Sequence, residues 1–338
     1  MTAATAAHLP QAIFLLGPTA SGKTALAMAL ADRFPVDIIS VDSALVYRDM
    51  NIGSAKPDVA TLARYPHQLI DLIDPTEAYS AARFCADARL AMAASVGRGR
   101  IPMLVGGTML YVKALTEGLS QLPVADPTVR AELAREAEKI GWAGMHTQLA
   151  KIDPVTAVRL KPTDSQRVQR ALEVFRLTGR SMSALYDETA PAPDFAFRTL
   201  RIGLTADRRD VLHQRIAARF TQMLSAGLVD ELYALRQKYA LHAEMPSMRA
   251  VGYRQAWQFI EGEIDESALI ETGIAATRQL AKRQMTWLRS LPNITPVECL
   301  AADLVESTMA RIEAFLATPT ELIARRRITK CVTTRRDI

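Results

Sequence analysis

Short apolar runs alternate with helix-forming segments along the first third of the chain. The runs 12–16, 36–41 and 101–105 are each bounded by polar residues, glycine or proline, which is typical of strands. Segments with helical character lie between them, at about 59–64 and 80–96. Strands that alternate with helices in this way favour a parallel sheet, so the pattern predicts an α/β fold.

The pattern changes in the middle of the chain, where nearly every segment is predicted to be helical. A proline-containing connector covers 118–126, and helices follow from 127 to about 180, with breaks at Gly141, Pro154 and Pro162. We interpret this stretch as a helical subdomain inserted into the α/β core.

Sheet and long helical patterns return after the insertion. Two prolines and polar turn residues occupy 189–194, residues 199–204 can rejoin the sheet as a strand, and 294–297 could form a last one. Long helical patterns fill 207 to about 290. The expected organisation is a flexible N-terminus at 1–10, a core at 11–122 and 199–300, an inserted helical subdomain at 123–198, and a terminal helix with a basic tail at 301–338.

Composition places the chain among ordinary folded proteins. Its 338 residues are 49% hydrophobic and include 16 Gly and 17 Pro, which excludes the disordered and collagen-like classes. Cys85, Cys299 and Cys331 are far apart and include no CxxC pair, so neither a disulfide framework nor a zinc site has a ligand set. No apolar stretch approaches a membrane span, and the N-terminus lacks the order of a signal peptide. We expect a protein of the reducing cytoplasm.

The charge balance favours an anionic partner. The chain has 41 Lys and Arg against 36 Asp and Glu, a formal net charge of +5. Nucleic acid or phosphate is the class this suggests, although many basic proteins bind neither. The tail from Ala324 onward has six Lys and Arg against Asp337 alone, and its simplest interpretation is a disordered end with a weak RNA contact.

A phosphate-binding loop is the clearest motif. Residues 17–24 match GxxxxGK[ST] in full and lie between a predicted strand and a predicted helix, which argues against a chance match. Glycines let backbone N–H groups turn toward phosphate oxygens, Lys23 neutralises charge and Thr24 can ligate Mg²⁺. The motif indicates a polyphosphate and leaves the reaction open. The predicted phosphate ligands are Gly17, Pro18, Thr19, Ala20, Ser21, Gly22, Lys23 and Thr24.

A carboxylate beside this loop is the second candidate. Asp42 directly follows the strand 36–41, at the sheet edge where open α/β folds bind ligands. It can serve as a metal ligand or a general base, or it can simply cap a turn. Asp71 also ends an apolar run, whereas the run 101–105 ends in Gly-Gly-Thr without an acid. Which acid assists a metal therefore stays open at this point.

Taken together, the motifs resemble those of the bacterial tRNA dimethylallyltransferases, also called tRNA isopentenyltransferases. The similarity spans about residues 11–290, and several of its segments are longer than a generic phosphate loop. It implies a P-loop NTPase-like parallel sheet with an inserted tRNA-binding helical subdomain. Besides the phosphate loop, the similar segments are 42–48 (DSALVYR), 51–57 (NIGSAKP), 69–75 (LIDLIDP), 104–111 (LVGGTMLY), 164–170 (DSQRVQR), 249–254 (RAVGYR) and 282–289 (KRQMTWLR).

The resemblance implies a reaction. Members of that family transfer a dimethylallyl group from dimethylallyl diphosphate to N6 of adenosine 37 in tRNAs that read codons starting with U, which gives N6-(dimethylallyl)adenosine and diphosphate. Here the phosphate loop would hold the prenyl diphosphate, with Lys23 and Mg²⁺ at Thr24 stabilising the leaving group. Asp42 would be the general base, and Thr108 would contact the flipped adenosine, cap a helix, or both.

Two basic helical faces are the predicted tRNA contacts. Lys282, Thr286 and Arg289 share one face of a helix, and the Gln and Arg side chains of 166–170 lie away from the apolar side. Without the resemblance, both faces would be interpreted as solvated surface. The full predicted tRNA-binding set is Asp42, Ser43, Ala44, Leu45, Thr108, Arg130, Gln166, Arg167, Val168, Gln169, Arg170, Arg249, Ala250, Val251, Gly252, Tyr253, Arg254, Lys282, Arg283, Gln284, Met285, Thr286, Trp287, Leu288 and Arg289.

Other side chains admit more than one interpretation. Arg219 is the preferred arginine for the diphosphate, with Arg215 as the alternative and a structural salt bridge possible for either. Tyr253, between two arginines, suits stacking on RNA, or it belongs to a surface turn at Gly252. The three tryptophans are expected to pack in the core or at an interface.

Two rival functions remain at this stage. A small-molecule or nucleoside kinase would use the same loop for ATP, with the arginine-rich segment 166–170 as a lid, but it leaves 249–254 and 282–289 without a role. A non-catalytic RNA-binding adaptor is disfavoured because Lys23, Thr24 and Asp42 are all present. The prediction is a Mg²⁺-dependent prenyltransferase that acts on the tRNA anticodon stem-loop as a monomer.

Overall fold

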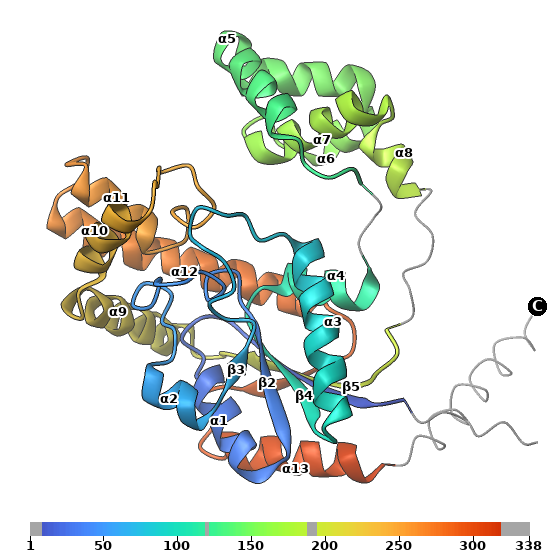
Figure 1. Cartoon of the computed structure of the whole chain (residues 1–338), viewed down its shortest axis with the longest axis vertical. Helices are drawn as coiled ribbons and strands as arrows, with labels where there is room; N and C mark the ends of the chain where they lie inside the picture. Colours follow the sequence, from blue (N-terminus) through green and yellow to red (C-terminus); the bar gives the residue numbers. More distant parts are fainter. Residues whose placement is uncertain (1–8, 119–121, 188–194, 319–338) are drawn as a thin grey trace, which may run out of the picture. The chain divides into compact units, whose positions relative to one another are not determined.

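The computed structural model describes residues 9–118, 122–187 and 195–318, and it divides into two compact units (Figure 1). The core unit comprises Met1–Thr116 and Phe195–Ile338, and the insertion comprises Glu117–Asp194. Residues 195–198, which the sequence places in the insertion, belong to the core unit because the rings of Phe195 and Phe14 pack with centroids 6.1 Å apart. The N-terminal residues 1–8, the turn segment 189–194 and the basic tail at 319–338 lie outside the described residues.

One six-stranded sheet forms the centre of the core unit. Its strands stand in the order β3-β2-β4-β1-β5-β6, and every neighbouring pair is parallel. This confirms the α/β class and the five strands expected from the sequence. The strands are β1 (Gln11–Leu16), β2 (Val36–Val41), β3 (His67–Gln68), β4 (Ile101–Gly106), β5 (Arg198–Thr205) and β6 (Ile294–Glu298).

Helices connect the strands and cover the sheet. The phosphate loop leads from β1 directly into the first helix, and the long helical stretch after β5 divides into four helices. The helices of the core unit are α1 (Lys23–Arg33), α2 (Val59–Arg64), α3 (Ala81–Gly97), α4 (Met109–Glu117), α9 (Arg209–Ser225), α10 (Leu228–Lys238), α11 (Tyr253–Ile260), α12 (Glu266–Ser290) and α13 (Leu304–Ala317).

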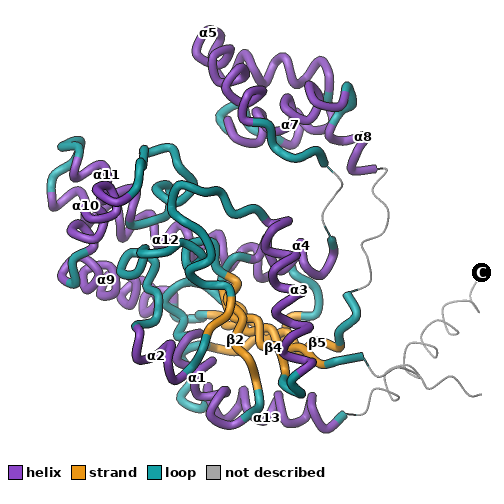
Figure 2. The backbone as a smooth tube through the Cα atoms, viewed as in Figure 1, coloured by secondary structure: helices purple, strands orange, loops and turns teal. Residues whose placement is uncertain are grey.

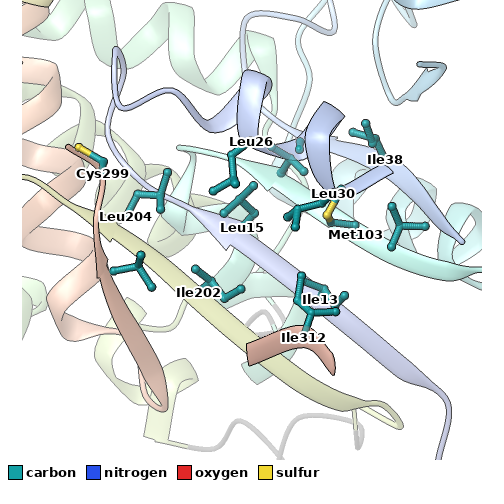
Figure 3. Close-up of a cluster of buried hydrophobic side chains, with 14 of the residues drawn as sticks. Ile13, Leu15, Leu26, Leu30, Ile38, Met103, Ile202, Leu204, Cys299 and Ile312 are labelled. Atoms are coloured by element: carbon teal, nitrogen blue, oxygen red, sulfur yellow. The ribbon is translucent and has the colours of Figure 1, made fainter. Parts of the chain in front are cut away.

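Alternate residues of β1 face two different hydrophobic clusters. Ile13 and Leu15 pack with side chains of α1, α9 and α13 (Figure 3). Phe14 and Leu16 pack on the opposite face with side chains of α3 and α4. Residues 12–16 have no exposed surface. Because both faces of the strand are buried, its sequence is a continuous apolar run and does not alternate.

A third cluster lies away from the sheet, where α9, α10, α11 and α12 pack on the loop after β2. Phe220 of α9 packs directly on α12 at Gly273, where an added Cβ would lie 2.0 Å from its ring. Figure 2 shows that the chain between β2 and α3 is mostly loop, interrupted by the short helix α2. This cluster therefore anchors a long irregular segment next to the carboxyl ends of the strands.

The insertion has a hydrophobic core of its own, which its four helices share. The breaks expected from the sequence are confirmed: Gly141 has a φ of 71° inside the first helix, Pro154 begins the second, and Pro162 lies in the turn before the third. Asp153 and Asp164 cap helices by accepting hydrogen bonds from backbone N–H groups three residues later. The helices are α5 (Pro127–Ile152), α6 (Pro154–Arg159), α7 (Ser165–Thr178) and α8 (Met182–Asp187).

Across residues 9–118, 122–187 and 195–318, no helix combines enough length with enough apolar character to cross a bilayer.

Candidate active site

A cavity of about 600 Å³ opens at the carboxyl ends of β1, β2 and β4. This is the edge at which open α/β sheets bind ligands. The phosphate loop, residues 42–45 after β2 and the turn at 107–110 after β4 contribute to the wall. The rest of the wall comes from residues 53–55, residues 249–252 and the helices α9 and α12. Five segments of the predicted site, far apart in sequence, therefore meet around one cavity: the phosphate loop, 42–45, the turn with Thr108, 249–252 and the 282–289 segment of α12.

The phosphate loop has a backbone that ordinary residues rarely adopt. Gly22, the residue before α1, has a φ of 85°, and Ala20 has a φ of 62°. Gly17 has no room for a side chain, since a Cβ there would lie 2.8 Å from the Cβ of Leu204. The Ser21 hydroxyl donates to the Pro18 carbonyl at 2.8 Å and closes the turn. Residues 19–25 line the cavity beside the positive end of α1, which favours an anion.

Two half-buried cationic side chains, Lys23 and Arg219, face the cavity. Lys23 Nζ donates to the Pro18 carbonyl oxygen at 2.5 Å. Burial lowers the pKa of Lys23 to about 8; the nearby Asp42 carboxylate raises this pKa, and the Arg219 guanidinium lowers it further. Burial also lowers the pKa of Arg219, against the opposing effect of Asp42. Arg219 lines the cavity and Arg215 does not, so the structure favours the arginine preferred from the sequence. The negative charge of Asp42 does not fully balance the positive charges of Lys23 and Arg219. Such an excess of positive charge suits a site that binds an anion.

Asp42 uses its two carboxylate oxygens differently. Oδ1 accepts hydrogen bonds from the N–H groups of Ala44, at 2.8 Å, and Leu45, at 3.4 Å, so the carboxylate does cap its own turn. Among the described residues, Oδ2 receives no hydrogen bond. The structural and the chemical interpretations of Asp42 are therefore compatible, because the second oxygen is left to accept a proton.

Thr108 joins the turn after β4 to the loop that begins at Asp42. Its Oγ1 accepts a hydrogen bond from the Ser43 N–H at 3.2 Å. Its own N–H donates to the Val41 carbonyl at 3.1 Å. Thr108 and Ser43 both line the cavity next to Asp42. A ligand bound in the cavity next to the Asp42 carboxylate would therefore lie close to the Thr108 side chain.

The basic face of α12 is present as expected. Lys282, Thr286 and Arg289 are exposed, while Ala281 lies in the core. Leu288 is only 1% exposed, so its place in the predicted tRNA-binding set is wrong; it packs under the sheet with the α3 and α4 side chains. On the same helix, Arg283, Gln284 and Trp287 line the cavity, and Met285 is half-buried. Trp287 is 37% exposed, so of the two places expected for it, the core or an interface, the core is excluded.

Tyr253 does not have the role expected from the sequence. Its side chain has no exposed surface and belongs to the third cluster, so the ring cannot stack on a base. Its hydroxyl donates to Glu231 Oε1 at 2.6 Å, and a Cβ on Gly53 would lie 2.6 Å from the ring. Gly252 is buried beside it, which excludes the surface-turn alternative as well. Arg249 and Arg254 on either side are exposed, and residues 249–252 line the cavity.

Glu231 of α10 supports the cavity wall and was not found from the sequence. Its carboxylate accepts hydrogen bonds from the N–H groups of Asn51 at 2.9 Å, Ile52 at 2.8 Å and Gly53 at 3.2 Å, besides the Tyr253 hydroxyl. It thereby holds the 51–53 segment to the start of α11. These partners lie at least 178 positions earlier in the chain, apart from Tyr253, so no local pattern could indicate the contact.

A buried carboxylate organises the predicted RNA face of the insertion. Glu173 has no exposed side-chain surface, and it accepts hydrogen bonds from Arg130 Nε at 2.9 Å and Arg170 Nη1 at 2.7 Å. Both arginines are therefore held in place within the insertion. Gln166 and Arg167 are exposed, the latter paired with Asp164 at 3.0 Å, whereas Gln169 is half-buried. Val168 has no exposed surface, so its assignment to the tRNA-binding set is wrong and it is a core residue.

The donor set fits a cation that is shared with a bound phosphate. Thr24 and Asp42 line the same cavity and offer a hydroxyl and a carboxylate. Mg²⁺ is commonly held by one or two protein oxygens together with substrate phosphates. Within the described parts of the chain, no group of three or more His, Cys, Asp or Glu side chains could hold a metal by itself. Asp71 does not contribute, because it lies outside the cavity wall and pairs with Lys56.

Comparison with known proteins gives one consistent result. The family model described as IPP transferase matches residues 45–291, and the isopentenyl transferase model matches residues 10–71. The chain is 57% identical over 308 residues to the tRNA dimethylallyltransferase of Thiobacillus denitrificans, covering 91% of this chain and 98% of that one. It is 58% identical over 315 residues to the enzyme of the same name from Ralstonia nicotianae, covering 92% and 98%.

Solved structures show the same similarity. The full-length tRNA isopentenylpyrophosphate transferase of Bacillus halodurans superposes with a TM-score of 0.67 at 34% identity, over 93% of this chain and 99% of that one. A eukaryotic dimethylallyltransferase acting on tRNA gives a TM-score of 0.71 at 26% identity, over 89% and 77% of the two chains. Both similarities extend over the core unit and the insertion.

Proposed function

The chain belongs to the IPP transferase family, and from this premise we propose that it transfers a dimethylallyl group from dimethylallyl diphosphate to N6 of adenosine 37 in the tRNA anticodon loop. Its relatives are tRNA dimethylallyltransferases, so it is a prenyltransferase with a P-loop NTPase-like fold, and tRNA is its substrate. The observation that supports the specific reaction is the cavity in which a phosphate loop, two half-buried cations and the Asp42 carboxylate meet.

The diphosphate end of the reaction is supported by the phosphate loop. Backbone N–H groups at the start of α1 and the charges of Lys23 and Arg219 match an anion that gains negative charge as it leaves. When the allylic C1–O bond breaks, its electron pair stays on the diphosphate oxygen. Groups that stabilise this oxygen more strongly in the transition state than in the bound substrate lower the barrier.

We further propose that Mg²⁺ is the divalent cation required by this family. Thr24 would hold it together with the diphosphate, consistent with a hydroxyl that lines the cavity beside the phosphate loop. The ion would supply additional neutralisation of the leaving group. The backbone N–H groups of the phosphate loop, Lys23 and Arg219 would bind and orient the diphosphate in addition to the ion.

The acceptor end of the reaction is supported by Asp42. The N6 amino group of adenine is a weak nucleophile because its lone pair is conjugated with the ring. As N6 forms a bond to C1 of the dimethylallyl group, one N6 proton must leave, and Oδ2 of Asp42, which does not take part in the turn cap, would accept it. Thr108 and Ser43 beside the carboxylate would orient the adenine. Adenosine 37 has to leave its stack to enter the cavity, as other enzymes that modify bases require.

The exposed basic side chains provide the contacts to the tRNA. Lys282, Arg289 and Thr286 on α12, together with Arg249 and Arg254 near the cavity, would contact the phosphates and sugars of the anticodon stem-loop. In the insertion, Arg130, Gln166, Arg167, Gln169 and Arg170 would bind the RNA from α5 and α7. We propose that the enzyme acts as a monomer in the cytoplasm, where tRNA is available and thiols such as Cys85 stay reduced.

A transfer assay tests the proposal. Purified protein, Mg²⁺, radiolabelled dimethylallyl diphosphate and an unmodified tRNA with adenines at 36 and 37 should give labelled tRNA. Asp42→Asn should abolish label transfer while tRNA affinity stays within a few-fold of the wild type, because Asn keeps the turn-capping oxygen and loses the base. Consumption of ATP without labelled tRNA would instead support a kinase, which the relatives do not favour. Normal turnover by Asp42→Asn would refute the assignment of the base.

A further inference from the structure

Gln284 of α12 joins two segments of the cavity wall through a single side-chain amide. Its Oε1 accepts a hydrogen bond from the Thr19 N–H of the phosphate loop at 2.8 Å. Its Nε2 donates to the carbonyl oxygen of Gly107 at 3.1 Å. The orientation of the amide is defined by its partners, because an N–H group can only donate and a carbonyl oxygen can only accept.

The turn after β4 is shaped to receive this amide. A Cβ on Gly107 would lie 2.2 Å from Gln284 Nε2 and 3.1 Å from the carbonyl oxygen of Gly17. Both distances are shorter than ordinary contacts, so a side chain at position 107 would displace the amide. The fit therefore depends on glycine at this position.

The turn that the Gln284 amide contacts is itself hydrogen-bonded to the residue before Asp42. The N–H groups of Gly107 and Thr108 both donate to the carbonyl of Val41, the residue before Asp42, at 3.2 and 3.1 Å. A continuous series of hydrogen bonds thus connects Thr19, through Gln284, to the end of β2. The loop assigned to the diphosphate and the carboxylate assigned to the acceptor share this support.

We propose that Gln284 is a positioning residue that holds the phosphate loop in register with Asp42, and that it is not an RNA contact. Resemblance alone placed it among the tRNA-binding side chains, yet its amide oxygen and nitrogen are already engaged with protein. The inference rests on the proposed function for the identity of the two groups that are held together. It assigns α12 two roles: an exposed basic face for the tRNA and an inward amide for the alignment of the reactants.

The first test replaces Gln284 by methionine, which has a similar length and forms neither hydrogen bond. Gln279→Met, at an exposed position of the same helix, is the matched control. Gln284→Met should lower kcat about tenfold and weaken the binding of inorganic diphosphate several-fold, with tRNA affinity within twofold of the wild type. The control should leave all three quantities unchanged. A loss of tRNA affinity with a normal kcat at saturating tRNA would overturn the proposal.

A second variant separates positioning from a general loss of stability. Gly107→Ala breaks the same contact from the opposite side, so its effect on kcat should overlap with that of Gln284→Met. The double variant should then be no less active than the less active of the two single variants. If the two sites acted independently, the two fold-losses in kcat would multiply. Multiplied losses would show that the contact does not carry the effect and would overturn the proposal.

The two hypotheses fail in different ways. If the wild type transfers no label, the proposed function fails, and calorimetry with inorganic diphosphate still tests Gln284. If the wild type transfers label while Gln284→Met matches it in kcat and diphosphate affinity, the role of Gln284 fails alone.

Discussion

Replacing Lys23 by methionine should stabilise the ligand-free protein while removing its ability to bind diphosphate. The reason is the burial of a cation without a carboxylate in direct contact. Burial lowers the pKa of Lys23 from 10.5 to about 8, and its hydrogen-bond acceptors are the Pro18 carbonyl and the Ser21 hydroxyl. Folding therefore places a charge in an environment that favours the neutral amine.

The magnitude follows from linkage between protonation and folding. Below pH 8 both states carry the proton, and the difference between 10.5 and about 8 corresponds to a cost of about 3 kcal/mol, at about 1.36 kcal/mol per pKa unit. Between the two pKa values the unfolded chain binds more protons than the folded one, so the stability of the wild type rises with pH. Lost hydrogen bonding to Pro18 offsets about 1 kcal/mol of the gain in the variant. The net stabilisation expected at pH 7 is about 2 kcal/mol.

The assay is urea unfolding followed by circular dichroism at pH 7 and pH 9.5. Lys23→Met should unfold at a higher urea concentration than the wild type at pH 7, and the difference should shrink by about 2 kcal/mol at pH 9.5. Lys282→Met, at an exposed position of α12, is the control and should match the wild type at both pH values. Inorganic diphosphate should stabilise the wild type and the control but not Lys23→Met. Equal stability of all three proteins at pH 7 would refute the burial argument.

Three further changes have definite expected results. Arg289→Ala should reduce the slope of log Kd for tRNA against log salt by about one, while Arg311→Ala, exposed on α13, should not; equal slopes would remove Arg289 from the RNA surface. Glu231→Gln should lower the unfolding free energy by about 1–3 kcal/mol, because an amide nitrogen would face backbone N–H groups; calorimetry showing an unchanged Tm would contradict this. Gly53→Ala should cost about 1–3 kcal/mol through overlap with the Tyr253 ring, and wild-type stability in urea would show that the ring can move.

Much of the core unit and part of the site could be predicted because their signals are local. The run 12–16, the glycines of the phosphate loop and the position of Asp42 after β2 each depend on neighbours within a few residues. The parallel sheet then places the ends of β1, β2 and β4 at one edge, so the meeting of Lys23 and Asp42 follows from the class of fold.

The remaining features depend on partners that are distant in sequence. Tyr253 looks like a stacking residue beside two arginines, yet Gly53 leaves room for its ring and Glu231 satisfies its hydroxyl. Gln284 looks like part of a basic face, yet Thr19, 265 positions earlier, takes its amide oxygen. Helical periodicity predicts which side of a helix is apolar. It does not predict which polar side chains on the other side form hydrogen bonds with distant segments of the chain.

The central position of β1 has a consequence for amide hydrogen exchange around the phosphate loop. Its backbone is hydrogen-bonded on both edges, to β4 and β5, and its side chains belong to the clusters on both faces of the sheet. Amide protons of β1 can therefore exchange with solvent only when the two clusters separate together, which makes this strand part of the most slowly exchanging unit. The phosphate loop is attached directly to it and is followed by α1, whose Leu26 and Leu30 pack on the same strand. A glycine-containing loop, which would be mobile in isolation, is thus held between two of the most protected elements of the protein.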